Sequence, residues 1–197
     1  MTIDHKFIDQ FVNITSKAAV ASYNLIGKKD KIAADKATVD SMRNNLNQLN
    51  IKGKIVIGEG ELDEAPMLYI GEEVGTTNGP EIDIAVDPLE GTNFAANNLP
   101  GALSVIAIAE KNNLFNAPET YMEKISANVN EKGVVDLDYS TKENIFNLCE
   151  YLNKKPESIT ACIMDRPRHK DIIDELNILG VKVKLITDGD VSGALLV

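Results

Sequence analysis

The sequence is poor in cysteine and in basic residues, and it contains no long hydrophobic run. We expect its two cysteines, Cys149 and Cys162, to be buried small hydrophobes in a reducing compartment rather than disulfide partners or metal ligands. The 20 basic and 30 acidic residues give a net charge of -10, which would repel a nucleic acid. No stretch approaches the roughly 20 apolar residues that span a bilayer, and residues 1–10 lack the apolar core of a signal peptide. We therefore expect a cytoplasmic protein with no nucleic-acid and no membrane partner.

The composition is that of a globular protein, and its apolar pattern alternates between helix and strand. With 44% hydrophobic and 25% charged residues, the 197 residues can bury the core of one or two domains. Helical spacing predicts an amphipathic helix over residues 7–25 and a second one that follows residues 28–31 and runs to Leu49. Apolar runs predict strands over residues 54–58, 82–86 and 102–109.

The C-terminal part repeats a strand and helix rhythm. A polar link over residues 131–140 and a helix over residues 143–152 come first. A strand, a helix, a strand and a helix are then expected over residues 159–164, 170–179, 181–186 and 191–197. Such a βαβα unit implies a parallel sheet. We expect an α/β protein with an α+β domain over residues 1–155 and the start of a second domain over residues 156–197.

Residues 82–92 carry the most informative motif. The apolar run up to residue 86 predicts a strand, which a proline and a glycine are expected to break, so that Asp87, Glu90 and Thr92 crowd one turn. Carboxylates three residues apart on a tight turn can converge on a hard cation such as Mg²⁺ or Mn²⁺. The N–H groups of a helix that starts near Asn93 can cradle a phosphate beside that cation. The alternative is an acidic surface turn that caps a helix.

A second predicted strand runs into four carboxylates within six residues: Glu59, Glu61, Asp63 and Glu64. Side chains two apart on an extended segment share a face while their neighbours point away, so not all four can bind one ion. The predicted ligand is Glu59, which stands between two glycines at the strand end; Glu61 is undecided. The last two carboxylates are better explained as the first turn of a helix that starts near Pro66 and is closed by Gly75.

Three segments resemble the bacterial class II fructose-1,6-bisphosphatases, which belong to the wider group of metal-dependent sugar and inositol phosphatases. These segments are residues 56–61, 63–71 and 83–92, and the resemblance runs from about Phe11 to the last residue. It implies a layered αβα sandwich of the sugar-phosphatase type, with the second, sugar-binding half incomplete. It also implies hydrolysis of fructose 1,6-bisphosphate in gluconeogenesis, with sedoheptulose 1,7-bisphosphate as a further substrate. We also expect a homo-oligomer.

The resemblance implies two divalent ions, either Mn²⁺ or Mg²⁺, and a set of catalytic residues. It assigns Asp35 and Glu59 to one ion and Asp87 and Glu90 to the other. Thr92, Asp87 and Glu59 are the implied catalytic residues, with Thr92 orienting the attacking water. By position alone, Asp35 is equally well explained as an acidic residue in the first turn of a helix, where it favours the helix dipole.

The resemblance also assigns substrate contacts to a tyrosine in a predicted helix and to residues at the ends of the predicted strands. The implied residues are Glu90, Gly91, Thr92, Tyr121, Arg166, Pro167, Arg168, Asp188, Gly189 and Asp190. Arginine forks fit phosphate oxygens, and carboxylates accept hydrogen bonds from sugar hydroxyls. Arg166 departs from the family, which tends to carry lysine there. Without the resemblance, Tyr121 is half-buried packing, the arginines are a solvated helix start, and Asp190 is an N-cap. His5 and His169 are expected to be structural or on the surface.

The C-terminus ends within an apolar run, residues 194–197, without a helix cap, so we expect the chain to be truncated. The family continues with a Gly-rich loop and a further glutamate ligand of the second ion. Because ligand number tunes the affinity of such sites, the ion at Asp87 and Glu90 is expected to bind weakly. Two alternatives stay open: an inositol or sugar monophosphatase, and a non-catalytic chain that binds a metal or a sugar phosphate.

Overall fold

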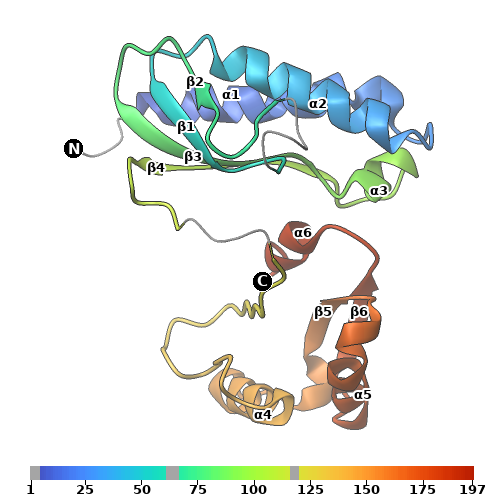
Figure 1. Ribbon diagram of the computed structural model, residues 1–197. Helices are drawn as coiled ribbons and strands as arrows, with labels where there is room; N and C mark the ends of the chain where they lie inside the picture. The colour runs from blue at the N-terminus through green and yellow to red at the C-terminus, as the bar shows by residue number, and fades with distance from the viewer. Residues whose placement is uncertain (1–4, 61–66, 116–119) are drawn as a thin grey trace. The chain divides into compact units, whose positions relative to one another are not determined.

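The computed structural model describes residues 5–60, 67–115 and 120–197, which fall into two compact units (Figure 1). The first unit is Met1–Thr120 and the second is Tyr121–Val197. The elements of the first unit are α1 (Lys6–Ala21), the 3₁₀ turn η1 (Tyr23–Leu25), α2 (Lys31–Leu46), β1 (Lys52–Ile57), β2 (Glu73–Val74), β3 (Glu81–Glu90), α3 (Thr92–Ala96) and β4 (Leu103–Glu110). None of the described helices is both long and apolar enough to cross a bilayer.

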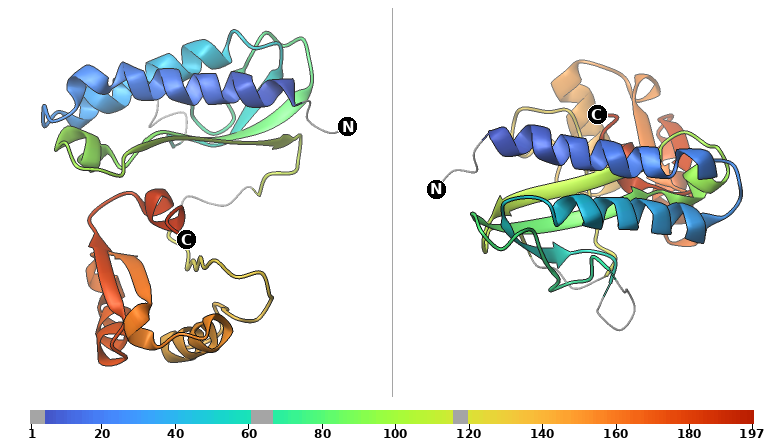
Figure 2. Two further views of the ribbon diagram at one scale, coloured as in Figure 1. Left: turned by 180° about the vertical axis from the view of Figure 1, so that it is seen from behind. Right: turned by 90° about the horizontal axis from the view of Figure 1, so that it is seen from above.

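The first unit is a mixed sheet with two long helices on one face. Its strand order is β2-β1-β3-β4; β1 runs parallel to β3, and the other pairs are antiparallel. Helices α1 and α2 lie side by side over the sheet, as Figures 1 and 2 show. The core between the layers includes Phe11, Ile14, Met42, Leu46, Ile55, Ile82 and Ile84. The predicted α/β character is therefore confirmed, as are both N-terminal helices, although α1 ends at Ala21 and continues only as the 3₁₀ turn.

Helix α2 begins and packs as its sequence predicts. Asp30 is its N-cap, and a side-chain oxygen of Asp30 accepts a hydrogen bond of 2.9 Å from the backbone N–H of Ala33. Val39, Met42 and Leu46 recur at helical spacing and are all buried against α1 and the sheet. Burial of side chains of this size contributes about 1.5–3 kcal/mol each, so this apolar stripe fixes how α2 lies on the sheet.

Strand β3 is longer than predicted, because it continues through Pro88 to Glu90. Its pairing with β4 passes from Asp87 opposite Val105 to Glu90 opposite Leu103, so three steps along β3 match two along β4. This irregularity is a β-bulge, the kind of position inside a sheet where a proline is tolerated. The prediction that Pro88 ends the strand was wrong, and the three oxygen-bearing side chains lie on a bulged strand end and a helix start rather than in one turn.

Two predicted helices do not occur in the described residues. Residues 67–75 form turns and the short strand β2, while Asp63, Glu64 and Pro66 lie outside the described residues. Residues 120–129, which include Tyr121, form neither a helix nor a strand, and residues 116–119 lie outside the described part of the chain. The first of these helices was predicted from acidic residues and Pro66 ahead of an apolar run, a local preference that tertiary context overrides here.

The second unit contains the predicted parallel strands. Its elements are α4 (Thr141–Leu152), the 3₁₀ turn η2 (Pro156–Ser158), β5 (Thr160–Met164), the 3₁₀ turn η3 (Pro167–His169), α5 (Lys170–Ile178), β6 (Lys182–Ile186) and α6 (Asp190–Ala194). Strands β5 and β6 pair in parallel, as expected for a βαβα unit. The core consists of Ile145, Cys149, Ile159, Leu176 and Val181. Because α4 supplies two of these side chains, the predicted domain boundary at residue 155 falls inside this unit.

Candidate active site

The bulged end of β3 leads directly into α3, and this corner carries four of the predicted residues: Asp87, Glu90, Gly91 and Thr92. Asp87 is exposed, whereas Glu90 is only 6% exposed. Gly91 precedes α3 with φ +79°, and a Cβ there would lie 2.9 Å from Cδ2 of Phe94, so a glycine suits this corner. Thr92 is the first residue of α3. The corner therefore presents two carboxylates and a hydroxyl within six residues.

Glu59 and Asp87 lie near the carboxyl ends of two adjacent parallel strands, β1 and β3. Ile57 on β1 pairs with Ala85 on the parallel strand β3. Ile57 is the last residue of β1, so Glu59 follows that strand, whereas Asp87 lies within β3. The carboxyl ends of adjacent parallel strands meet at one edge of a sheet, where α/β proteins commonly bind ligands. Two predicted metal ligands from different strands thus lie at the same edge.

The backbone around Glu59 is tied to the segment that follows it. Its N–H donates to the carbonyl of Leu68 at 3.0 Å, and the N–H of Ile70 donates to the carbonyl of Gly60 at 2.9 Å. Leu68 is fully buried. These bonds extend the pairing beyond β1 and hold Glu59 half-buried at the strand end.

Asp35 lies on α2 where this helix packs against the β3–α3 corner. The neighbouring Ala34 forms a buried cluster with Leu89 and Ala95. Asp35 is the fifth residue of α2, and the first turn contains no acidic residue, so its explanation as a first-turn helix residue was wrong. Burial raises the pKa of the Asp35 carboxyl above its ordinary value of 3.8, because the charged form is desolvated. A bound cation would offset that desolvation.

We expect Asp35→Asn to stabilise the metal-free protein at neutral pH. The pKa of Asp35 is higher in the folded protein than in the unfolded chain, so the folded state binds the proton more tightly. This preference stabilises the fold fully below the ordinary pKa of 3.8, and the stabilisation is lost as the pH rises through the raised pKa. The Tm difference between variant and wild type should be near zero in acid and grow towards pH 7. Thermal melts in a chelator over this pH range would measure it. A variant that melts below the wild type at pH 7 would contradict the prediction.

The donor set suits a hard divalent cation. All four predicted ligands are carboxylates, and oxygen donors are what Mg²⁺ and Mn²⁺ prefer. Within residues 5–60, 67–115 and 120–197, no three His, Cys, Asp or Glu side chains lie close enough together to hold a metal ion. Glu61, Asp63 and Glu64 lie outside these ranges. The two predicted pairs, Asp35 with Glu59 and Asp87 with Glu90, stay a prediction.

In the second unit, the predicted substrate residues follow β5 and β6 at one sheet edge. Arg166 joins the two strand ends, because its Nη1 donates to the carbonyl of Asp165 at 3.0 Å and its Nη2 donates to the carbonyl of Thr187 at 2.8 Å. His169 also contacts the end of β5, because its Nδ1 lies 2.7 Å from the carbonyl oxygen of Met164. Two donors of Arg166 thus have a structural role that its sequence position did not reveal.

Two further contacts bring residues 121–124 to this edge. The guanidinium carbon of Arg168 lies 4.2 Å from the ring centre of Tyr121, a cation–π geometry. Nζ of Lys124 lies 2.5 Å from Oδ2 of Asp190. Asp190 is the first residue of α6, and Gly189 occupies the N-cap position that the sequence had suggested for Asp190. Lys124 was missed, because a long-range ion pair leaves no local pattern.

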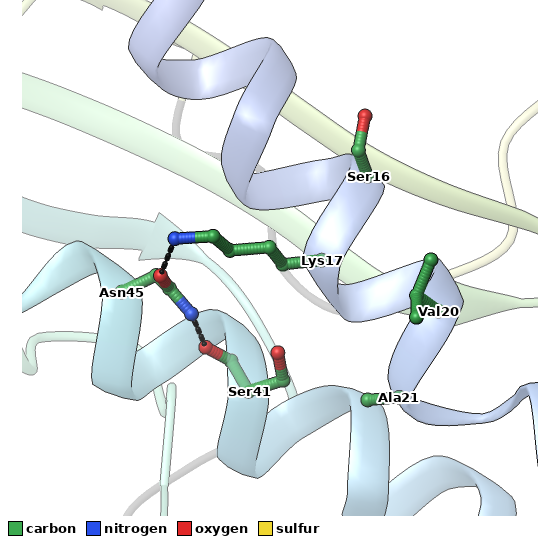
Figure 3. A pocket seen from close by; sticks show the side chains of 6 residues that line it. All are labelled: Ser16, Lys17, Val20, Ala21, Ser41 and Asn45. Atoms are coloured by element: carbon green, nitrogen blue, oxygen red, sulfur yellow. Dashed lines mark hydrogen bonds between the residues drawn. The ribbon is translucent and has the colours of Figure 1, made fainter.

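A shallow hollow between α1 and α2 contains none of the predicted residues (Figure 3). It has a volume of about 400 Å³ and is lined by Ser16, Lys17, Val20, Ala21, Ser41 and Asn45. Nζ of Lys17 donates to Oδ1 of Asn45 at 2.9 Å, and Nδ2 of Asn45 donates to the carbonyl of Ser41 at 2.7 Å. The residues that line the hollow include no carboxylate, histidine or cysteine.

An α/β fold with carboxylates at the carboxyl ends of adjacent parallel strands defines a class of protein that binds ligands at a sheet edge. The family model described as "Bacterial fructose-1,6-bisphosphatase, glpX-encoded" matches residues 5–197, and the chain belongs to this family. The family is dependent on divalent metals.

Curated relatives agree with this assignment. The chain is 50% identical over 193 residues to a D-fructose 1,6-bisphosphatase class 2/sedoheptulose 1,7-bisphosphatase of Synechococcus sp. (strain CC9902), covering 98% of this chain and 58% of that protein. It is 48% identical over 198 residues to a protein of the same name from Thermosynechococcus vestitus, covering 94% of this chain and 57% of that protein. The chain therefore spans somewhat more than half the length of these relatives.

Proposed function

We propose that the chain takes part in metal-dependent hydrolysis of fructose 1,6-bisphosphate to fructose 6-phosphate and phosphate, a step of gluconeogenesis. The observation that carries this proposal is that Glu59 and Asp87 lie near the carboxyl ends of adjacent parallel strands in a chain of this family. The named activities of the relatives support sedoheptulose 1,7-bisphosphate as a second substrate.

The proposed ions are Mn²⁺ or Mg²⁺, one held by Asp35 and Glu59 and the other by Asp87 and Glu90. When bound, two such ions clamp a phosphate, lower the pKa of a water molecule and neutralise the leaving alkoxide. Thr92 orients the attacking water with its hydroxyl, because it begins α3 at the corner that carries the second carboxylate pair. Asp35 is half-buried and Glu90 is buried, so two of the four carboxylates are shielded from bulk water.

Substrate selectivity comes from the edge of β5 and β6. Arg168 and Tyr121 together present a guanidinium and a phenol to a sugar phosphate, and the loop of Asp188, Gly189 and Asp190 accepts hydrogen bonds from sugar hydroxyls. Arg166 holds this loop by its bond to the carbonyl of Thr187 and contributes positive charge to the phosphate. Pro167 begins the turn that places Arg168.

The finer architecture is part of the same proposal. The family assignment and the two helices over the sheet support a layered αβα sandwich of the sugar-phosphatase type in the complete protein, with the units Met1–Thr120 and Tyr121–Val197 contributing to its two halves. We also propose a cytoplasmic homo-oligomer. Its size can be measured by light scattering.

Phosphate release from fructose 1,6-bisphosphate, with Mn²⁺, with Mg²⁺ and with EDTA, tests the proposed function. We expect metal-dependent release from the bisphosphates of fructose and sedoheptulose and much slower release from inositol monophosphate. Equal rates on a monophosphate would favour the monophosphatase alternative. Metal binding by folded protein without turnover would contradict the proposed catalysis and favour a binding role.

A further inference from the structure

A buried carboxylate, Glu72, lies beside the predicted site and belongs to none of the predicted residue sets. Its side chain is only 5% exposed. One oxygen, Oε1, accepts a hydrogen bond of 2.5 Å from Nε of Arg43, and the other, Oε2, accepts one from the backbone N–H of Leu68. A buried charge is expensive unless it is paired and hydrogen-bonded, and here both oxygens have partners. The carboxylate therefore fixes two groups at once.

Leu68 connects this carboxylate to Glu59. The N–H of Leu68 donates to Glu72, while its carbonyl accepts the N–H of Glu59 at 3.0 Å. Leu68 is fully buried and adopts φ +54°, an uncommon conformation for a branched side chain. Such a conformation persists where the surroundings determine it, and the bond to Glu72 is one such restraint. Displacing Glu72 would therefore remove a restraint on Leu68, whose carbonyl accepts the N–H of Glu59.

Arg43 extends the link to α2, the helix that carries Asp35. Glu72 also belongs to the backbone pairing of β1, since its carbonyl accepts the N–H of Ile55 at 2.9 Å. The chain of contacts runs from α2 through Arg43, Glu72 and Leu68 to Glu59. Arg43 lies in the last turn of α2, eight residues beyond Asp35, so these contacts tie the C-terminal part of the helix that carries Asp35 to the strand end that carries Glu59.

We infer that Arg43 and Glu72 are positioning residues for the metal site of Asp35 and Glu59. They hold the segment after β1 against α2, so that the Glu59 carboxylate is kept at a fixed place relative to Asp35. This inference rests on the proposed function for its metal, but the contacts that carry it do not. Groups that orient metal ligands in this way typically change metal affinity about 10–100-fold when they are replaced.

The test combines Mn²⁺ affinity by calorimetry with hydrogen exchange at individual amides. In Glu72→Gln, one of the two acceptor oxygens is replaced by an NH₂ group, which cannot accept a hydrogen bond. The side chain can then no longer accept from both Arg43 and Leu68. We expect Mn²⁺ affinity to fall about tenfold or more, and protection of the Glu59 amide to fall more than that of Ile84 in the core. The control is Glu73→Gln, which makes the same change at the exposed neighbouring residue and should leave both quantities unchanged.

Two variants of Arg43 test the same contacts in case the Glu72→Gln protein does not fold. Arg43→Lys keeps the positive charge but loses the planar fork, so it should lower Mn²⁺ affinity less than Arg43→Met. Unchanged affinity in these variants, or equal loss of protection at Glu59 and Ile84, would overturn the positioning role alone. A wild-type chain that binds no Mn²⁺ would overturn the proposed metal site, and the positioning role with it.

Discussion

Asp87→Ala should abolish metal-dependent phosphate release while leaving the fold intact. Asp87 lies near the carboxyl end of β3, and its side chain is exposed. Losing one carboxylate from a dication site removes several kcal/mol of charge stabilisation in the transition state, which corresponds to a rate loss of about 10³-fold or more. The free energy of unfolding should change by less than about 0.5 kcal/mol, as for most exposed positions.

Glu81→Ala is the matched control for this experiment. Glu81 is an exposed carboxylate at the other end of the same strand, and it pairs with Lys52 and Lys111 at the surface. Exposed ion pairs of this kind contribute about 0–1 kcal/mol, so the control should fold and retain its rate. The two variants are compared by phosphate release at saturating Mn²⁺ and by urea unfolding. Full activity in Asp87→Ala, or equal loss in both variants, would contradict the assignment of Asp87.

Apolar periodicity predicted the elements of this fold better than it predicted their ends. Val39, Met42 and Leu46 mark α2 by their spacing, and the run that ends at Met164 marks β5, because both patterns are local and repeat. Pro88 was misread as a strand end, since a bulge depends on the partner strand and not on the sequence of β3 alone. Pairing between strands thus determined where β3 ends, which its apolar periodicity alone did not predict.

The site shows the same division between local and long-range information. Carboxylates at strand ends can be recognised from a single segment, and the parallel pairing of β1 with β3 then brings Glu59 and Asp87 to one edge. The contacts of Glu72 with Arg43, and of Lys124 with Asp190, join residues 29 and 66 positions apart. No motif marks such pairs in one sequence, so the residues that support the predicted ligands had to be found in the structure.

Gly58→Ala should be the most destabilising single substitution near the site. A Cβ at Gly58 would lie 2.0 Å from the carbonyl oxygen of Leu68 and 2.7 Å from Cγ2 of Ile55. The oxygen belongs to the backbone and already accepts the N–H of Glu59, so it cannot move away without breaking that bond. We expect a loss of about 3 kcal/mol or more in the free energy of unfolding, at the upper end of what overpacking usually causes.

Gly71→Ala separates this steric effect from the conformational effect of replacing a glycine. Gly71 has φ +96°, and no atom of the described residues lies within 4 Å of the position its Cβ would take. Only backbone strain of about 1–2 kcal/mol is therefore expected. The midpoint of urea unfolding should be lowered more by Gly58→Ala than by Gly71→Ala. The reverse order would show that the close approach of Leu68 to Gly58 does not hold the end of β1, and that Glu59 rests on a looser segment than these contacts indicate.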